Sequence, residues 1–172
     1  MHEVFLGLGS NIGERETILN QACKEIERLI GPVVGRSAFI ETEPWGFKSA
    51  NKFMNAVVRC HTNLEPLPLL NVTQSIERIL GKRKKHATER NPSPSTLHLP
   101  PSTLHLPLST LYHDRPIDID ILLYDCATIN EPRLQVPHPL MLQRDFVMIP
   151  LREVLKQEGD EKYMDFLFGQ MK

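Results

Sequence analysis

The chain has 172 residues, of which 41% are hydrophobic and 24% charged, and its formal net charge at pH 7 is −1. This size and composition are typical of one globular domain with its own core. The near-neutral charge argues against a nucleic-acid-binding module, and no apolar stretch approaches the roughly 20 residues that a membrane span needs. We therefore expect neither a nucleic-acid partner nor a membrane partner.

The cysteines, Cys23, Cys60 and Cys126, lie far apart and form no CxxC pair. This spacing favours free thiols in a reducing compartment over a disulfide framework or a zinc site. The first residues show no basic segment followed by an apolar run, which argues against a signal peptide. We expect a cytoplasmic monomer.

Hydrophobic periodicity predicts alternating strands and helices in the first 80 residues. The first strand ends in a glycine-rich turn, and the first helix stops at Gly31, which precedes a proline. Strands rich in β-branched residues follow, separated by a segment too rich in proline and glycine for regular structure. The predicted strands are 4–9, 33–41 and 53–62, and the predicted helices are 18–30 and 66–80.

The second half of the chain begins its regular structure at residues 118–124, the clearest strand of the sequence. Residues 138–155 are predicted to be mostly helical with a break near Pro150, and a final helix follows. The resulting order is β-α-β-β-α-β with a helical C-terminal addition. It predicts an α+β, ferredoxin-like fold in which helices pack on an antiparallel sheet, within a single domain that spans 1–172.

Residues 91–111 do not fit this pattern. The segment 95–101, Ser-Thr-Leu-His-Leu-Pro-Pro, is nearly repeated at 102–108, and a third copy begins at Ser109. The unit is too short for a solenoid repeat, and its prolines disfavour both helix and central strand. We interpret the segment as an inserted, mobile, Pro-rich loop. It is either a lid or partner-binding tract or an expansion tolerated at the surface, and the small entropic cost of loop lengthening favours the second.

The most informative pattern is the run from Arg115 to Tyr124, Arg-Pro-Ile-Asp-Ile-Asp-Ile-Leu-Leu-Tyr. Strand side chains alternate between two faces, so Asp118 and Asp120 should share one face. Two neighbouring carboxylates resist joint ionisation, and a divalent cation such as magnesium resolves that conflict. The alternative is a solvated acidic face, which the continuing apolar run makes less favourable. The opposite face, directed into the core, is predicted to carry Ile117, Ile119, Ile121 and Leu123.

Cationic side chains flank this acidic strand. Arg115 precedes it, Arg133 and Arg144 follow it, and the run 82–85 comes after the second predicted helix. Guanidinium groups and lysines suit phosphate oxygens, so the combination predicts a metal–nucleotide site. Taken alone, the run 82–85 is better explained as a solvated surface.

The glycines near the N-terminus offer a competing phosphate site. No P-loop motif occurs, and Gly7, Gly9 and Gly13 differ by one residue from the dinucleotide-binding fingerprint. Because no second parallel βαβ unit follows, we interpret these glycines as a tight turn with close helix packing.

Scarce aromatic residues suggest where a flat ligand would bind. Trp45, Phe53, Tyr112 and Phe146 lie near polar or proline-rich stretches, and a heterocycle would stack between two such rings. Each ring alone is better explained by core packing. Asn55 shares a strand face with Phe53, and its amide could read the edge of a ring. His138 is either a phosphate donor or a structural histidine.

Together these motifs resemble the 6-hydroxymethyl-7,8-dihydropterin pyrophosphokinase family of folate biosynthesis. The matching stretches occur in the family's order over nearly the whole chain apart from the insert. They are Leu8–Asn11, Thr42–Gly46, Phe53–Val57, Gln74–Glu77, Arg115–Leu123 and Val136–Pro139.

The resemblance implies transfer of pyrophosphate from ATP to the pterin hydroxymethyl group, with AMP as the second product. It implies two Mg²⁺ ions held by Asp118 and Asp120, and phosphate contacts from Arg115 and Arg144; these four are the implied catalytic residues. The pterin would lie between Phe53 and Phe146, with its edge read by Thr42, Pro44, Trp45 and Asn55. The nucleotide would be surrounded by Gln74, Glu77, Lys82, Lys85, Ile121, Arg133 and His138.

The chain departs from the family pattern just before the acidic strand. His113 and Asp114 stand where the family often has Gly-Pro, and the connection after Gly81 is about twenty residues longer than expected for such a loop. Two other functions fit parts of the sequence: a non-catalytic ferredoxin-like ligand-binding domain, and an interaction module that displays the Pro-rich repeat. Magnesium dependence of the activity separates the enzyme from the binding domain.

Overall fold

The computed structural model describes residues 1–46, 48–81, 114–156 and 159–169. Within these ranges an antiparallel sheet has the order β2-β4-β1-β5, and β3 pairs with β4. This order confirms the ferredoxin-like α+β prediction. The predicted insert, 91–111, lies outside the described residues and stays a prediction. The strands are β1 (His2–Ser10), β2 (Val33–Arg36), β3 (Ile40–Thr42), β4 (Phe53–Thr62) and β5 (Asp118–Tyr124).

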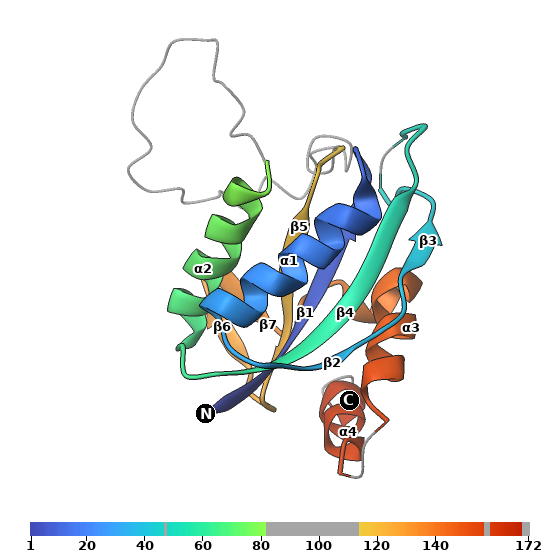
Figure 1. Cartoon of the computed structure of the whole chain (residues 1–172). Helices are drawn as coiled ribbons and strands as arrows, with labels where there is room; N and C mark the ends of the chain where they lie inside the picture. Colours follow the sequence, from blue (N-terminus) through green and yellow to red (C-terminus); the bar gives the residue numbers. More distant parts are fainter. Residues whose placement is uncertain (47, 82–113, 157–158, 170–172) are drawn as a thin grey trace.

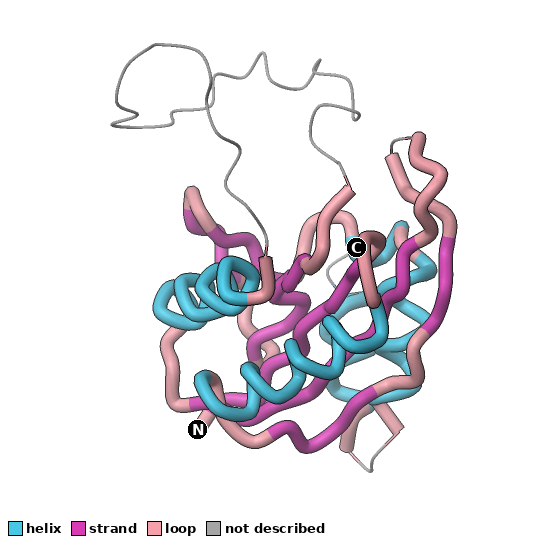
Figure 2. The backbone as a smooth tube through the Cα atoms, turned by 45° about the horizontal axis from the view of Figure 1, so that its top comes forward, coloured by secondary structure: helices cyan, strands magenta, loops and turns pink. Residues whose placement is uncertain are grey.

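Helices cover both faces of the sheet (Figures 1 and 2). One face carries α1 (Arg15–Leu29) and α2 (Pro66–Ile79), and the other carries α3 (Asp145–Val154) and α4 (Glu161–Gly169). The chain turns after α1 at Gly31, whose φ is +146° and where an added Cβ would lie 2.1 Å from the carbonyl oxygen of His61. Only glycine fits this close approach between helix end and sheet.

The apolar residues form two separate cores, one on each sheet face. Leu19, Ala22 and Ile26 of α1 pack in the first core, because their helical spacing places them on one side of the helix. Met148 and Leu151 of α3 pack in the second core. The sheet is therefore buried on both faces over much of its area.

A bulge in β5 changes which face its last residues occupy. The pairing shifts from Phe5 opposite Leu123 to Leu6 opposite Ile121, which leaves Leu122 as an extra residue. Leu122 and Leu123 both pack in the second core. The prediction that Leu123 shares a face with Ile117, Ile119 and Ile121 is therefore wrong, because a bulge interrupts strict alternation.

Two other predictions need correction, and one hairpin was missed. The strand predicted at 33–41 is two strands, interrupted where the Ser37 hydroxyl accepts a hydrogen bond of 3.0 Å from the backbone N–H of Val57. Pro150 does not break α3, because the buried apolar side of this helix compensates for the missing N–H. The hairpin of β6 (Ile129–Glu131) and β7 (Leu134–Val136) was not predicted at all.

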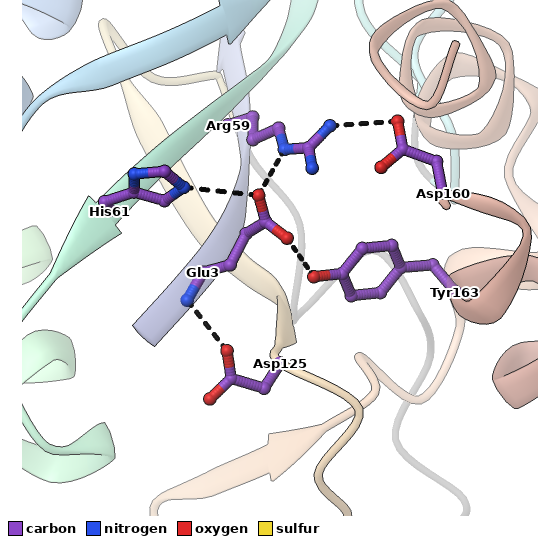
Figure 3. Close-up of polar contacts among 6 residues, drawn as sticks. All are labelled: Glu3, Arg59, His61, Asp125, Asp160 and Tyr163. Carbon is purple, nitrogen blue, oxygen red and sulfur yellow. Dashed lines mark hydrogen bonds and ion pairs between the residues drawn. The ribbon is translucent and has the colours of Figure 1, made fainter. Parts of the chain in front are cut away.

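A polar network joins α4 to the end of the sheet where β1 begins (Figure 3). Arg59 donates to Glu3 at 2.6 Å and to Asp160 at 2.9 Å, and His61 lies 3.3 Å from Glu3. The Tyr163 hydroxyl also donates to Glu3. Burial alone would raise the pKa of Glu3, but these hydrogen bonds and the charge of Arg59 lower the pKa to about 2. The carboxylate therefore stabilises the folded chain.

The first testable prediction concerns this carboxylate. Because the pKa of Glu3 is about 2 in the folded chain against an ordinary 4.5, its stabilisation is complete above pH 4.5 and is lost as the pH falls toward 2. Glu3→Gln should lower the free energy of unfolding at pH 7 by about 1–3 kcal/mol. Urea titrations across this pH range should also show a shallower pH dependence for the variant.

The control for this prediction is Glu25→Gln. Glu25 pairs with Arg28 on the outer surface of α1, so its loss should change the free energy of unfolding by less than about 0.5 kcal/mol. Parallel pH curves for wild type and Glu3→Gln would contradict the assigned role of Glu3.

Candidate active site

A pocket opens on the second sheet face, at the end of β1 and the beginning of β4 and β5. About 610 Å³ of space not filled by protein atoms lies within it, including open solvent at its mouth. The lining residues come from β1, β3, β4, β5, α3, the loop after β3, and the segments just before β5 and α3. They are Gly7, Leu8, Gly9, Thr42, Glu43, Trp45, Phe53, Asn55, Ala56, Val57, Arg115, Asp118, Asp120, Leu122, Arg144, Phe146 and Val147.

Two glycines of β1 lie in the floor of this pocket. Gly7 and Gly9 lie inside the strand, so their interpretation as a tight turn is wrong; the turn that follows contains Gly13, with φ of +74°. A Cβ at Gly9 would lie 3.2 Å from Oδ1 of Asn55 and 3.6 Å from the ring of Phe53. The missing side chain therefore leaves room directly beside the predicted pterin-binding groups.

The predicted pterin-binding residues gather around this glycine floor. Asn55 is buried, and its Nδ2 donates to the Thr42 hydroxyl at 2.8 Å across the β3–β4 pair. Phe53 begins β4 and Phe146 lies in the first turn of α3, and both rings line the pocket. Pro44 is half-buried next to Trp45, but its side chain is not part of the lining.

The two predicted phosphate-binding arginines lie against aromatic rings. The guanidinium carbon of Arg115 is 5.5 Å from the Phe53 ring centroid. That of Arg144 is 4.6 Å from the Trp45 centroid and 5.7 Å from the Phe146 centroid. Cation–π contacts of this kind hold both guanidinium groups inside the pocket, beside the acids of β5.

Asp118 and Asp120 both line the pocket, as strand alternation predicts. Arg115 Nη2 is 2.9 Å from Asp118 Oδ2. Burial, and then the negative charge of Asp118, raise the pKa of Asp120, although Arg115 and Arg144 oppose this. Buried Glu77 of α2 accepts a 2.8 Å hydrogen bond from the backbone N–H of Ile119, which fixes the strand between the two acids.

This donor set fits magnesium. No group of three or more His, Cys, Asp or Glu side chains in the described part of the chain is arranged to hold a metal ion without further ligands. Asp118 and Asp120 make each other's ionisation less favourable, and both lie at the wall of an open pocket. Such a pair suits magnesium, because water and substrate phosphates usually complete the coordination of this ion.

The remaining predicted nucleotide residues lie toward α2 and β7, outside the pocket lining. His138 Nε2 is 4.0 Å from Asp120 Oδ2, and burial, followed by the charge of Arg144, lowers the pKa of His138 to about 4. Arg133 donates to Asn71 of α2 at 2.9 Å, and Gln74 is exposed on the same helix. The Ile121 side chain packs in the first core. Lys82 and Lys85 lie outside the described residues.

Sequence reasoning assigned no role to two residues at this site. Glu43 lines the pocket between Thr42 and Trp45, and its place within a matching motif was the available signal. Asn11 belongs to the motif at the end of β1, and its Oδ1 accepts a 2.8 Å hydrogen bond from the backbone N–H of Arg115. That contact joins residues 104 positions apart, so no local sequence pattern indicates it.

A ferredoxin-like α+β domain thus presents aromatic rings, two arginines and a carboxylate pair in one pocket. These features define an enzyme of the phosphoryl-transfer class acting on a flat heterocycle.

Comparison with known proteins places the chain within that class. The family model described as 7,8-dihydro-6-hydroxymethylpterin-pyrophosphokinase (HPPK) matches residues 5–99 and 104–156. A Porphyromonas gingivalis protein named 2-amino-4-hydroxy-6-hydroxymethyldihydropteridine pyrophosphokinase is 41% identical over 152 residues, with 88% of this chain and 89% of the relative covered. A Bacillus subtilis protein of the same name is 34% identical over 158 residues, with 91% and 80% covered. The chain belongs to the HPPK family.

Solved structures agree on the fold. An HPPK-DHPS in complex with substrates superposes with a TM-score of 0.63 at 14% identity, over 89% of this chain and 40% of that one. A Plasmodium falciparum HPPK-DHPS triple mutant gives a TM-score of 0.62 at 16% identity, over 91% and 41%. The chain therefore spans about 40% of the length of these structures. Among the described residues, no helix has the length and apolar character that a membrane span requires.

The second testable prediction concerns the pocket floor. Gly9→Ala would place a methyl group 3.2 Å from Asn55 Oδ1 and should push this amide away from the pterin edge. We expect the KM for the pterin to rise about tenfold, with a smaller change in the KM for ATP. Steady-state kinetics with each substrate varied in turn measures both values.

The matched control is Gly35→Ala on β2, where the added methyl would meet Val154 at 3.3 Å, in the second core. This variant should lower the melting temperature and leave both KM values close to those of wild type. An unchanged pterin KM for Gly9→Ala would contradict the placement of the pterin over the glycine floor.

Proposed function

We propose that this chain transfers the pyrophosphoryl group of ATP to the hydroxymethyl oxygen of 6-hydroxymethyl-7,8-dihydropterin, in folate synthesis. The bond from the β-phosphorus to the α,β-bridging oxygen breaks as the bond to the pterin oxygen forms, and AMP leaves. Family membership supports the reaction. The observation that carries it in this chain is the single pocket in which Phe53, Phe146, Asp118 and Asp120 meet.

In the proposed complex the pterin lies between Phe53 and Phe146, above Gly9. Stacking between two rings fixes the plane of a flat heterocycle and excludes water from its faces. The Thr42 hydroxyl accepts from Asn55, so the orientation of this amide is set before the ligand binds. A preorientated amide discriminates between ring edges at little entropic cost.

The phosphates are proposed to bind at Arg115 and Arg144. Both guanidinium groups are already held by ring contacts, and Arg115 also by Asp118. Because transfer of this kind depends mainly on positioning and charge neutralisation, groups that are ordered in advance lower its barrier. Lys82 and Lys85 are proposed to contribute further positive charge.

We assign two magnesium ions to Asp118 and Asp120. When bound, the metal would neutralise phosphate charge and polarise the transferring group. Glu77 keeps the strand between the two acids in place through Ile119. His138 is neutral near pH 7 because of its lowered pKa, so it can donate to a nucleotide phosphate without adding charge.

The nucleotide is proposed to extend from Asp120 toward α2 and β7. Gln74, Arg133 and His138 lie on that side, and the backbone of Ile121 is proposed to contact the nucleotide because its side chain is buried in the first core. The contacts of α2 with both β5 and β7 hold this side of the site together.

The third testable prediction is the reaction itself. The chain should form AMP and the pterin diphosphate from ATP and 6-hydroxymethyl-7,8-dihydropterin when magnesium is present, and neither product after chelation of the metal. Asp118→Asn and Asp120→Asn should each lower kcat at least about 100-fold, because each removes a metal-binding charge from the transition state. Chromatographic separation of the products measures both effects.

Asp165→Asn, an exposed position on α4, is the control and should leave turnover unchanged. Near-normal turnover of either pocket variant would contradict the metal assignment. Pterin binding that is independent of magnesium, with no AMP formed, would instead favour the non-catalytic ligand-binding domain.

A further inference from the structure

Asp114 lies where three segments of the active site meet. It directly precedes Arg115, on the approach to β5. Its Oδ1 accepts a 2.6 Å hydrogen bond from Asn11 Nδ2, at the end of β1. Its Oδ2 accepts a 2.9 Å hydrogen bond from Asn51 Nδ2, at the end of the loop that contains Trp45. One carboxylate thus links the loop beside the pterin pocket to the segment that carries a phosphate-binding arginine.

Asn11 completes this link to Arg115. Its Oδ1 accepts from the Arg115 backbone N–H at 2.8 Å, and its backbone N–H donates to the Arg115 carbonyl at 3.2 Å. The Asn11 side-chain amide therefore donates to Asp114 through Nδ2 and accepts from Arg115 through Oδ1. Because Asp114 accepts from Nδ2, it fixes which end of the amide faces Arg115.

The position of Arg115 matters because its guanidinium has two neighbours in the pocket. It lies 2.9 Å from Asp118 and 5.5 Å from the Phe53 ring centroid. A rotation of the backbone at Arg115 would move this group away from both. The backbone contacts with Asn11 resist such a rotation, and Asp114 holds Asn11 in place.

We propose that Asp114 is a positioning residue, which aims Arg115 at the transferring phosphates by holding the amides of Asn11 and Asn51. This inference rests on the proposed function. It gives a physical role to a position at which the family often has a proline, a residue with no side-chain acceptor. Two carboxylate oxygens facing two amide donors form a matched set that neither proline nor alanine can supply.

The loop that carries Asn51 also has a second attachment. Arg15 Nη1 donates to the carbonyl of Lys52 at 2.7 Å, which tethers the same end of the loop independently of Asp114. The Asp114–Asn51 hydrogen bond is exposed. Variants at Asp114 should therefore fold, and their melting temperatures should stay within a few degrees of wild type.

The fourth testable prediction exchanges the two groups. Asp114→Ala removes both acceptors and should lower kcat/KM about tenfold. Asn51→Asp alone places two carboxylates together and should also lower it. The double variant Asp114→Asn/Asn51→Asp restores a donor for each acceptor, so its kcat/KM should return to within about threefold of wild type. AMP formation at saturating and limiting pterin gives these values.

A second comparison tests whether Asp114 acts through Arg115. In an Arg115→Ala background, Asp114→Ala should change the rate of AMP formation less than about twofold, because the group that Asp114 positions is absent. A purely structural role would give the same loss in both backgrounds. Asp125→Asn is the matched control: this carboxylate also accepts from two groups, His2 Nδ1 and the Glu3 backbone N–H, but lies outside the pocket. Its activity should equal wild type.

The outcomes separate this inference from the function on which it rests. Recovery in the exchanged pair together with non-additivity at Arg115 would support the positioning role. An active wild type with no recovery in the exchanged pair, or with additive losses, would overturn the positioning role alone. A folded wild type that forms no AMP would overturn the proposed function and the positioning role with it.

Discussion

The register of β1 between β4 and β5 is the constraint on which the site depends. Gly9 pairs with Asn55 on one side and with Asp118 on the other, and Gly7 pairs with Asp120. The amide assigned to the pterin and the acids assigned to the metal are thus cross-strand neighbours of the same two glycines. A slip of one residue would turn either set to the opposite face of the sheet. The backbone pairing of the central strand therefore brings together groups that lie more than sixty residues apart in the sequence.

The unequal covering of the two sheet faces makes room for this site. On the second face, α3 and α4 pack over Phe5, Val57 and Leu122, and the pocket occupies the end that they leave open. At the opposite end, Arg59 binds both Glu3 and Asp160. Burying these charges is costly unless each is paired, so the network specifies one position for α4. Fixing α4 there keeps this helix away from the pocket, to which α3 contributes Phe146 and Val147.

Much of this arrangement was predictable from local sequence patterns. The alternation in β5 placed Asp118 and Asp120 on one face because the bulge begins only at Leu122, beyond both acids. The same rule failed at Leu123, since a bulge depends on how two strands pair and leaves no mark in the sequence of either. The role of Gly9 was missed for a related reason. The space that this glycine leaves open matters because the side chains of Asn55 and Phe53, on the neighbouring strand, lie beside it. The contacts of Asp114 with Asn11 and Asn51 likewise depend on the folded chain.

The charges of the pocket support the proposal that a cation binds there. Among the described lining residues, three carboxylates, Asp118, Asp120 and Glu43, face two guanidinium groups, so the pocket carries one formal negative charge when all are ionised. A nucleotide triphosphate would add several more, and the raised pKa of Asp120 already reflects the cost of a second carboxylate. Protonation of Asp120 relieves the repulsion without a ligand, whereas a divalent cation relieves it and attracts phosphates as well. In the proposed complex the acids would thus make phosphate binding depend on the metal, whereas the arginines alone would bind phosphate without it.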